Sequence, residues 1–196
     1  MPSAERTLDA ALATPAGGSA RGLVAPDVGA AVELPWFVVR GAEPGPTLLV
    51  TAGVHGAEYA SIEAAYRAAE QSPNGLRGTL LVLPIVCPPS YAARTVYVNP
   101  VDGLNLNRVF PGRDDGTFAE RLAGWLMREA VGAARESGAP YIVLVGDKPY
   151  YWPFGFETAP RGLISMPGPV DPSRLLICSL EPDVVERMGG MVRWAG

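Results

Sequence analysis

The run TLLVLPIV, from Thr79 to Val86, is almost wholly apolar. Neighbouring side chains of a β-strand point to opposite faces of the sheet, so both faces of such a strand must be covered. Helices provide that cover in α/β proteins, whereas a sheet with one face in water alternates apolar and polar residues. The run therefore predicts a central strand with helices on each side.

Two segments that flank this run have the spacing of amphipathic helices. Residues 58–70 predict a helix whose buried face is formed by Tyr59, Ile62, Tyr66 and Ala69. Thr117 and Glu120 have capping-box spacing at the start of a second helix, which should run to about Ser137.

Further apolar runs predict more strands. Residues 33–40 and 47–52 are separated by GAEPGP, which predicts a turn between two strands that form a hairpin or lie side by side. Residues 141–146 and 175–180 predict two more strands, and residues 183–194 predict a short helix. Because strands and helices alternate, we expect a three-layer α/β fold, with a largely parallel or mixed sheet and helices on both faces.

The length of the chain indicates how many domains to expect. A chain of 196 residues has the usual size of one domain, so we expect residues 1–196 to form a single domain. Residues 1–30 are rich in Ala, Gly and Pro and have no sustained period. We expect them to be a weakly structured lead-in.

Charge and cysteine usage argue against several classes of protein. Lys and Arg number 16 against 20 Asp and Glu, whereas nucleic-acid-binding proteins usually carry a basic excess that neutralises phosphates. The only cysteines, Cys87 and Cys178, provide neither a disulfide framework nor a Cys-x-x-Cys metal site. There is also no leader-like N-terminus and no long apolar run. We expect a cytoplasmic protein whose partner is a small molecule, not a nucleic acid or a membrane, and its oligomeric state is left open.

The only histidine of the chain, His55, lies in the segment HGAE directly after an apolar strand. Ligand sites of parallel α/β sheets lie at such strand ends. Glu58 follows three residues later, and an imidazole and a carboxylate at this spacing can bind one Zn²⁺ through nitrogen and oxygen. The alternative is structural: His55 orders the loop and Glu58 favours the helix N-terminus by its charge.

A second group of polar residues lies in NLNRVFPG, residues 105–112. Arg108 offers a planar fork of donors that suits a carboxylate, and Asn107 can donate and accept beside it. Arg94 is a weaker candidate for a second anion contact. The alternative is that Arg108 only satisfies loop carbonyls.

Together, GVHGAE after an apolar strand and NLNRVFPG, with its arginine 53 residues after His55, resemble the succinylglutamate desuccinylase and aspartoacylase family of zinc-dependent deacylases. The resemblance covers roughly residues 34–134. It implies a three-layer α/β fold of the zinc carboxypeptidase type. It also implies that His55 and Glu58 are zinc ligands and that Asn107 and Arg108 bind the substrate carboxylate.

The chain departs from this family in two respects and resembles a shortened form of it. The family's third zinc ligand is a histidine after a later strand, and this chain has no second histidine. Asp147, at the end of the strand predicted at residues 141–146, is one candidate for an oxygen ligand. The family also has a late glutamate that acts as general base and acid. Glu157 and Glu181 are candidates, and the catalytic residue is left open.

Two functional hypotheses follow from these residues. The first is a zinc-dependent hydrolase that cleaves the amide bond of an N-acyl amino acid or a similar small carboxylated amide. The second is a shortened, inactive family member that binds a small carboxylate without a tightly held metal. Motifs of serine hydrolases and of phosphate-binding loops are absent from the sequence. Cys87 is open to two interpretations, a buried thiol or a nucleophile.

Overall fold

The computed structural model describes residues 7–136 and 138–191. They form two compact units, one that ends at Ala133 and one that begins at Ala134. The single domain expected from chain length stays a prediction. None of the helices within the described ranges is both long and apolar enough to cross a membrane.

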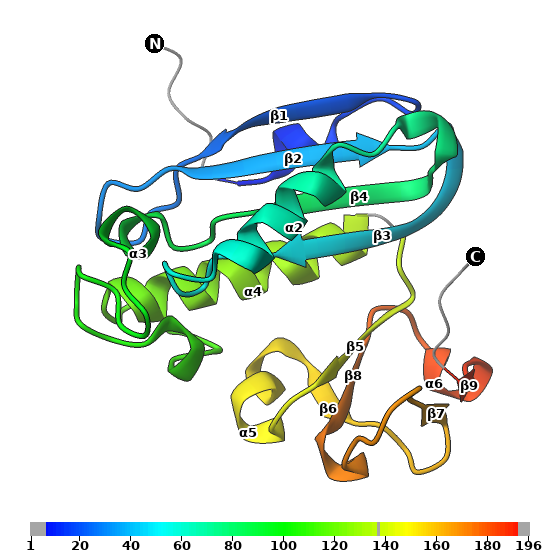
Figure 1. Cartoon of the computed structure of the whole chain (residues 1–196). Coiled ribbons are helices and arrows are strands. Elements are labelled where there is room, and N and C mark those ends of the chain that lie inside the picture. The colour runs from blue at the N-terminus through cyan, green and yellow to red at the C-terminus, as the bar shows by residue number, and fades with distance from the viewer. Residues whose placement is uncertain (1–6, 137, 192–196) are drawn as a thin grey trace. The chain divides into compact units, whose positions relative to one another are not determined.

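The first unit is built around a four-stranded mixed sheet (Figure 1). Its elements, in chain order, are α1 (Asp9–Leu12), β1 (Ser19–Val24), β2 (Leu34–Arg40), β3 (Glu43–Thr51), α2 (Tyr59–Ala69), η1 (Pro73–Gly75), β4 (Arg77–Leu83), α3 (Pro88–Ala93), η2 (Leu106–Arg108) and α4 (Phe118–Glu136). The strand order is β1-β2-β4-β3. Strand β4 therefore lies inside the sheet, as its apolar sequence predicts.

Side chains of β4 alternate between two cores, which gives this unit three layers. Leu81 and Leu83 belong to the larger core, which α1 and α4 cover. Leu80 and Val82 belong to the smaller core on the other face, where Ala65 of α2 packs. Figure 1 shows α2 and α4 on opposite faces of the sheet. The three-layer α/β fold predicted from the sequence is confirmed.

The mixed sheet agrees with the prediction, whereas the order of its strands differs from it. The sheet is mixed, and only β3 and β4 run parallel, whereas β1/β2 and β2/β4 are antiparallel pairs. Strands β2 and β3 are not neighbours because β4 lies between them. The chain leaves β3 through α2 and returns as β4, and such a crossover places the returning strand parallel to the first.

Two further expectations are corrected in this unit. Residues 1–30 are not a weakly structured lead-in where they are described, because β1 pairs along its length with β2 and Leu8 is buried in the core. Helix α2 buries Ile62 and Ala65, whereas Tyr59 is 49% exposed. The ring of Tyr59 instead lies 6.4 Å from that of Tyr91, in an edge-to-face arrangement. Helix α4 confirms the helix predicted after Thr117.

The second unit is rich in short strands. Its elements are β5 (Tyr141–Val145), α5 (Lys148–Tyr151), η3 (Trp152–Phe154), β6 (Phe156–Thr158), β7 (Ile164–Ser165), η4 (Pro172–Arg174), β8 (Leu175–Ser179), α6 (Val184–Arg187) and β9 (Gly190–Met191). Strands β5 and β8 confirm two predicted strands, in an antiparallel sheet of order β5-β8-β6. The helix predicted over residues 183–194 is shorter, and residues 192–196 lie outside the described ranges.

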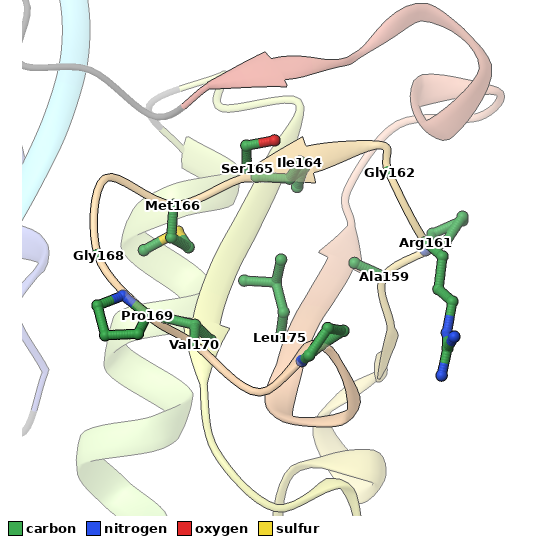
Figure 2. A pocket seen from close by; sticks show the side chains of 12 residues that line it. Ala159, Arg161, Gly162, Ile164, Ser165, Met166, Gly168, Pro169, Val170 and Leu175 are labelled. Carbon is green, nitrogen blue, oxygen red and sulfur yellow. The ribbon is translucent and has the colours of Figure 1, made fainter.

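A pocket of about 490 Å³ lies within the second unit (Figure 2). Apolar side chains such as Val170 and Leu175 line it, and Arg161 is its one charged lining residue. In Figure 2 the side chain of Arg161 extends away from Met166 and Val170. The residues that line this pocket include no carboxylate, imidazole or thiol, so they offer neither acid–base chemistry nor a strong metal ligand.

Candidate active site

The loop between β3 and α2 holds His55 at the end of a sheet strand. Its backbone is shaped by two glycines. Gly53 has a φ of +67°, a conformation that side chains disfavour. Gly56 is pressed against α3, because a Cβ at this position would lie 1.7 Å from the carbonyl oxygen of Ser90. The loop can therefore approach α3 closely only with glycine at residue 56.

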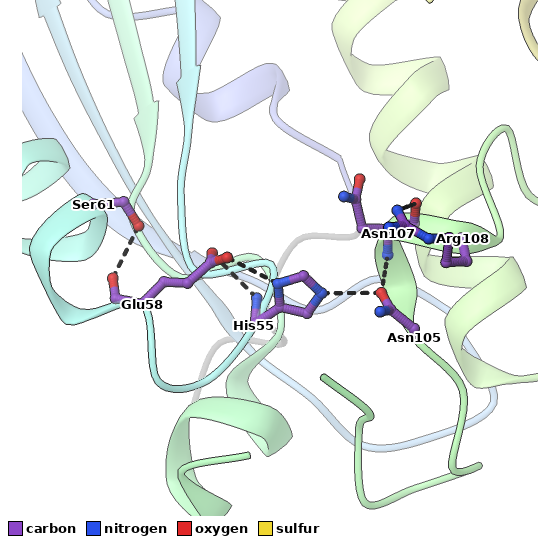
Figure 3. Close-up of polar contacts among 6 residues, drawn as sticks. All are labelled: His55, Glu58, Ser61, Asn105, Asn107 and Arg108. Atoms are coloured by element: carbon purple, nitrogen blue, oxygen red, sulfur yellow. Dashed lines mark hydrogen bonds and ion pairs between the residues drawn. The ribbon is translucent and has the colours of Figure 1, made fainter. Parts of the chain in front are cut away.

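His55 and Glu58 face each other across this loop (Figure 3). The Nδ1 atom of His55 lies 2.8 Å from Oε1 of Glu58, and the backbone N–H of His55 donates to Oε2 at 3.4 Å. The side chain of His55 is 14% exposed and that of Glu58 is 45% exposed. The pair is thus fixed on one side by the protein and open to solvent on the other.

The opposite nitrogen of the imidazole contacts a residue far away in the sequence. Nε2 of His55 lies 2.9 Å from Oδ1 of Asn105. The same oxygen accepts a hydrogen bond of 2.9 Å from the backbone N–H of Asn107 and so caps η2. This contact joins the two segments, HGAE and NLNRVFPG, that sequence analysis singled out separately.

A network behind η2 orders the long loop that carries it. Asn99 is 2% exposed, and its side-chain oxygen accepts hydrogen bonds from the N–H groups of Val101 and Asp102. Asp102 in turn accepts from the N–H groups of Leu104, at 3.1 Å, and Ala119, at 2.8 Å. Burial alone would raise the pKa of Asp102, but these hydrogen bonds outweigh it and hold the pKa below its ordinary value. The loop is thereby attached to the start of α4.

Asn107 and Arg108 lie on the exposed side of η2. The Nη1 atom of Arg108 donates to the carbonyl oxygen of Asn107 at 3.2 Å. Within the described ranges Arg108 has no carboxylate partner, so most of its donors face solvent. One part of the structural alternative holds, since Arg108 does bond a loop carbonyl, yet the guanidinium keeps donors for an added anion.

The charges around His55 act on its pKa in opposite directions. Burial lowers the pKa, whereas hydrogen bonds to Asn105 and Glu58 and the negative charge of Glu58 raise it. The positive charge of Arg108 lowers it. The net result is a raised pKa.

The His55 and Glu58 pair fits two positions of a zinc site. Zinc bonds of about 2.1 Å in tetrahedral geometry place two ligand atoms about 3.4 Å apart. Nδ1 and Oε1, now 2.8 Å apart, would need to separate only slightly. No group of three or more His, Cys, Asp and Glu side chains that could hold a metal occurs among the described residues. The pair is therefore suited to a cation, and a third protein ligand is not part of this arrangement.

The other carboxylates considered from the sequence lie in the second unit and form ion pairs there. Asp147 lies 3.0 Å from Nε of Arg174, and Glu181 lies 3.3 Å from Nη2 of Arg187. Glu157 pairs with Lys148. Their roles as third ligand or general base stay predictions.

The surroundings of Cys87 and Arg94 give less support for a role in catalysis or in anion binding. The thiol of Cys87 is buried and donates to Oγ of Ser90 at 3.2 Å, and burial raises its pKa, which favours the neutral form. This environment supports the interpretation as a buried thiol over that as a nucleophile. Arg94 ends α3 with a φ of +55° and is exposed.

Sequence reasoning missed two neighbours of His55. Asn105 lies in the second motif, and its role as a cap has a local signal, because Asn-x-Asn suits a side chain that accepts from the N–H two residues later. Tyr97 has no such signal. Its ring centroid lies 6.0 Å from that of His55 in an edge-to-face arrangement, and the side chain is 68% exposed. No local pattern points to this contact.

Comparisons with known proteins find similar sequences and structures. Residues 44–136 match the model of the succinylglutamate desuccinylase/aspartoacylase catalytic domain. The N-alpha-acetyl-L-2,4-diaminobutyric acid deacetylase of Halomonas elongata is 38% identical over 104 residues, which are 52% of this chain and 29% of that protein.

Two solved structures are also similar. A succinylglutamate desuccinylase/aspartoacylase from Rhodobacter sphaeroides is 34% identical with a TM-score of 0.52, over 59% of this chain and 37% of that one. The product-bound ectoine utilization protein EutE (DoeB) from Ruegeria pomeroyi is 32% identical with a TM-score of 0.52, over 61% and 38%. The chain thus spans less than half the length of each of these relatives. Residues 44–136, which hold the His55 and Arg108 segments, are thus similar to the catalytic domain of the succinylglutamate desuccinylase/aspartoacylase family.

Proposed function

We propose that this protein is a zinc-dependent hydrolase that cleaves the amide bond of an N-acyl amino acid or a similar small carboxylated amide. One observation carries the proposal: the imidazole and carboxylate that suit a metal are joined through Asn105 to the turn that presents Asn107 and Arg108. A cation site and an anion site, carried by two different loops, are thus connected through Asn105. A small substrate with a carboxylate near its amide fits such an arrangement.

His55 and Glu58 would hold the metal through Nδ1 and a carboxylate oxygen. Bound zinc polarises a carbonyl group and lowers the pKa of a coordinated water to about 7. The protein itself contributes position. Arg108 would bind the substrate carboxylate by two parallel hydrogen bonds, and Asn107 would add a third contact, so that the amide is held near the metal.

The relatives support the substrate class. Their names describe a deacetylase of an acetylated diamino acid and desuccinylases of succinylglutamate, all small acylated amino acids. The alternative of an inactive carboxylate-binding relative is less favoured, because these names describe deacylases. The proposed partner is therefore a small molecule.

A zinc measurement combined with an assay tests the proposal. Purified protein, supplemented with zinc and then dialysed, should retain bound metal and release free amine from a panel of N-acetyl and N-succinyl amino acids. The variant H55A should lose both the metal and the activity. E63Q, which alters an exposed carboxylate on α2 that pairs with Arg67, serves as the matched control. A folded wild-type protein that retains no zinc, or an activity unchanged in H55A, would contradict the proposal.

A further inference from the structure

A second pocket of the first unit lies away from the His55 site. It has a volume of about 510 Å³, and strands β1 and β2 and the last turn of α2 line it. We call it the Arg21–Glu70 pocket after its two charged lining residues. Glu58, which contacts His55, precedes α2, whereas Glu70 follows the helix. A helix of 11 residues separates its ends by about 16 Å, so the pocket is distinct from the site described above.

The pocket exists because α2 covers only part of one sheet face. The smaller core on that face includes Phe37 and Val39 of β2 but no described residue of β1. On the opposite face, Ala20 and Val24 of β1 pack into the larger core. Arg21 of β1 lies directly opposite Phe37 in the antiparallel pair, so its exposed side chain shares the face that α2 covers. The uncovered strip beside β1 is therefore a hollow with an arginine at its edge.

Two aromatic rings form a wall of this hollow. Phe37 and Tyr66 are half-buried, and their ring centroids lie 5.5 Å apart in an edge-to-face arrangement. Rings packed in this way present a large apolar surface at a fixed position. The wall therefore suits the hydrocarbon part of a small molecule.

The two charged residues of the pocket do not neutralise each other. Among the described residues, neither Arg21 nor Glu70 forms an ion pair. Glu70 contributes to the raised pKa of Arg67 on the same helix, but the guanidinium of Arg67 bonds Glu63, at 2.8 Å. Arg21 and Glu70 can therefore both form charge-assisted hydrogen bonds with a ligand.

The end of α2 adds negative potential around Glu70. The helix ends at Ala69, and Glu70 is its C-cap residue. Carbonyl groups at the end of a helix carry partial negative charge, so a carboxylate is disfavoured there and a cation is favoured. The surroundings of Glu70 thus favour a positive group, whereas Arg21 favours a negative one.

We propose that the Arg21–Glu70 pocket binds a free amino acid with an apolar side chain, in its zwitterionic form. The carboxylate bonds Arg21, the ammonium group bonds Glu70, and the side chain packs on the two rings. With a charge-assisted hydrogen bond of about 2.8 Å at each end, such a molecule spans about 8 Å between its partners. The inference does not depend on the proposed function. An N-acyl amino acid has no ammonium group, so the pocket discriminates against the acylated form.

Three related probes test which charges the pocket recognises. L-phenylalanine carries both charges, N-acetyl-L-phenylalanine lacks the ammonium group, and phenethylamine lacks the carboxylate. Each probe is titrated into the ¹⁵N-labelled full chain, and the amide signals of Arg21, Ala69 and Glu70 are followed by NMR. We expect L-phenylalanine to shift these signals, and each of the other two probes to bind at least about 10-fold more weakly, because one charge-assisted hydrogen bond is lost.

Substitutions show which residue meets which charge. R21Q should weaken the binding of L-phenylalanine at least about 10-fold but leave that of phenethylamine unchanged, because phenethylamine has no carboxylate. E70Q should likewise weaken L-phenylalanine but not N-acetyl-L-phenylalanine. E63Q is the matched control for E70Q, because Glu63 is an exposed carboxylate on the same helix that bonds Arg67. A general disturbance of the fold would change the affinity for all probes together.

R108A separates this pocket from the His55 site. It should leave the L-phenylalanine shifts at Arg21 and Glu70 unchanged. If L-phenylalanine shifts only signals of the His55 and Arg108 segments, or binds R21Q and E70Q as tightly as wild type, the inference is wrong even where deacylase activity is found. Equal binding of phenethylamine and L-phenylalanine also overturns it. If the pocket binds L-phenylalanine as expected while no N-acyl amino acid is hydrolysed, the inference holds and the proposed function fails.

Discussion

Oδ2 of Asp102 accepts a hydrogen bond of 2.8 Å from the backbone N–H of Ala119, in the first turn of α4. The other oxygen accepts from the N–H of Leu104, the residue before the Asn105 cap. One carboxylate thereby connects the turn that carries Asn107 and Arg108 to the longest helix among the described residues. The site depends on this connection because the loop before it contains no extended secondary structure.

Removal of this carboxylate should therefore destabilise the fold. In D102A the N–H groups of Leu104 and Ala119 lose their acceptor, and we expect the free energy of unfolding to fall by about 2 to 3 kcal/mol. Urea denaturation measures the difference. Asp115 is a matched control, since its side chain is 89% exposed and its Oδ1 lies 3.7 Å from Nε of Arg113. D115A should change stability by less than about 0.5 kcal/mol, and an equal effect of both variants would show that Asp102 has no special role.

Stability should also depend on pH through Asp102. Its pKa is lower in the folded protein than the ordinary value of 3.8. The ionised form is therefore favoured by folding, and its contribution is complete above pH 3.8 and lost as the pH falls through the lower folded value. The difference in unfolding free energy between wild type and D102N should shrink as the pH is lowered through this range. A difference that stays constant, or grows, contradicts the assignment.

Substrate binding should depend on the shape of the Arg108 side chain as well as on its charge. Lysine keeps the charge but cannot form two parallel hydrogen bonds with a carboxylate. We expect R108K to lower kcat/KM about 10-fold and R108A about 100-fold, mainly through KM. R67A removes an exposed arginine that is paired with Glu63, and it should leave kcat and KM unchanged. If R108K matches wild type, the guanidinium acts only as a point charge.

Local patterns in the sequence predicted the elements more reliably than their arrangement. Helices α2 and α4 and the central β4 follow from periodicity and from an apolar run, which are properties of single segments. The strand order does not, because the position of β4 between β2 and β3 results from the crossover through α2. β1 was missed because its Ala- and Gly-containing sequence buries only its final residue, Val24, and leaves little alternation to detect.

The site residues, like the fold, were predicted where the signal is local and missed where it depends on distant segments. His55, Glu58, Asn107 and Arg108 were named from two short motifs whose chemistry can be read locally. Asn105 was missed as a partner of His55 because their contact spans 50 residues and depends on how the long loop folds. The polar network of Asn99 and Asp102 was missed for the same reason.

The close approach of the His55 loop to α3 gives a last prediction. A Cβ at Gly56 would lie 1.7 Å from the carbonyl oxygen of Ser90, a backbone atom that cannot move without α3. We therefore expect G56A to lower the free energy of unfolding by about 2 to 4 kcal/mol and to weaken Zn²⁺ binding, because the loop must shift His55. At Gly75 a Cβ would have no such atom within 4 Å, so G75A should change stability by less than about 0.5 kcal/mol. Thermal unfolding and zinc titration of both variants measure these effects. If G56A is as stable as G75A and binds zinc as wild type does, the loop does not depend on this contact to position His55.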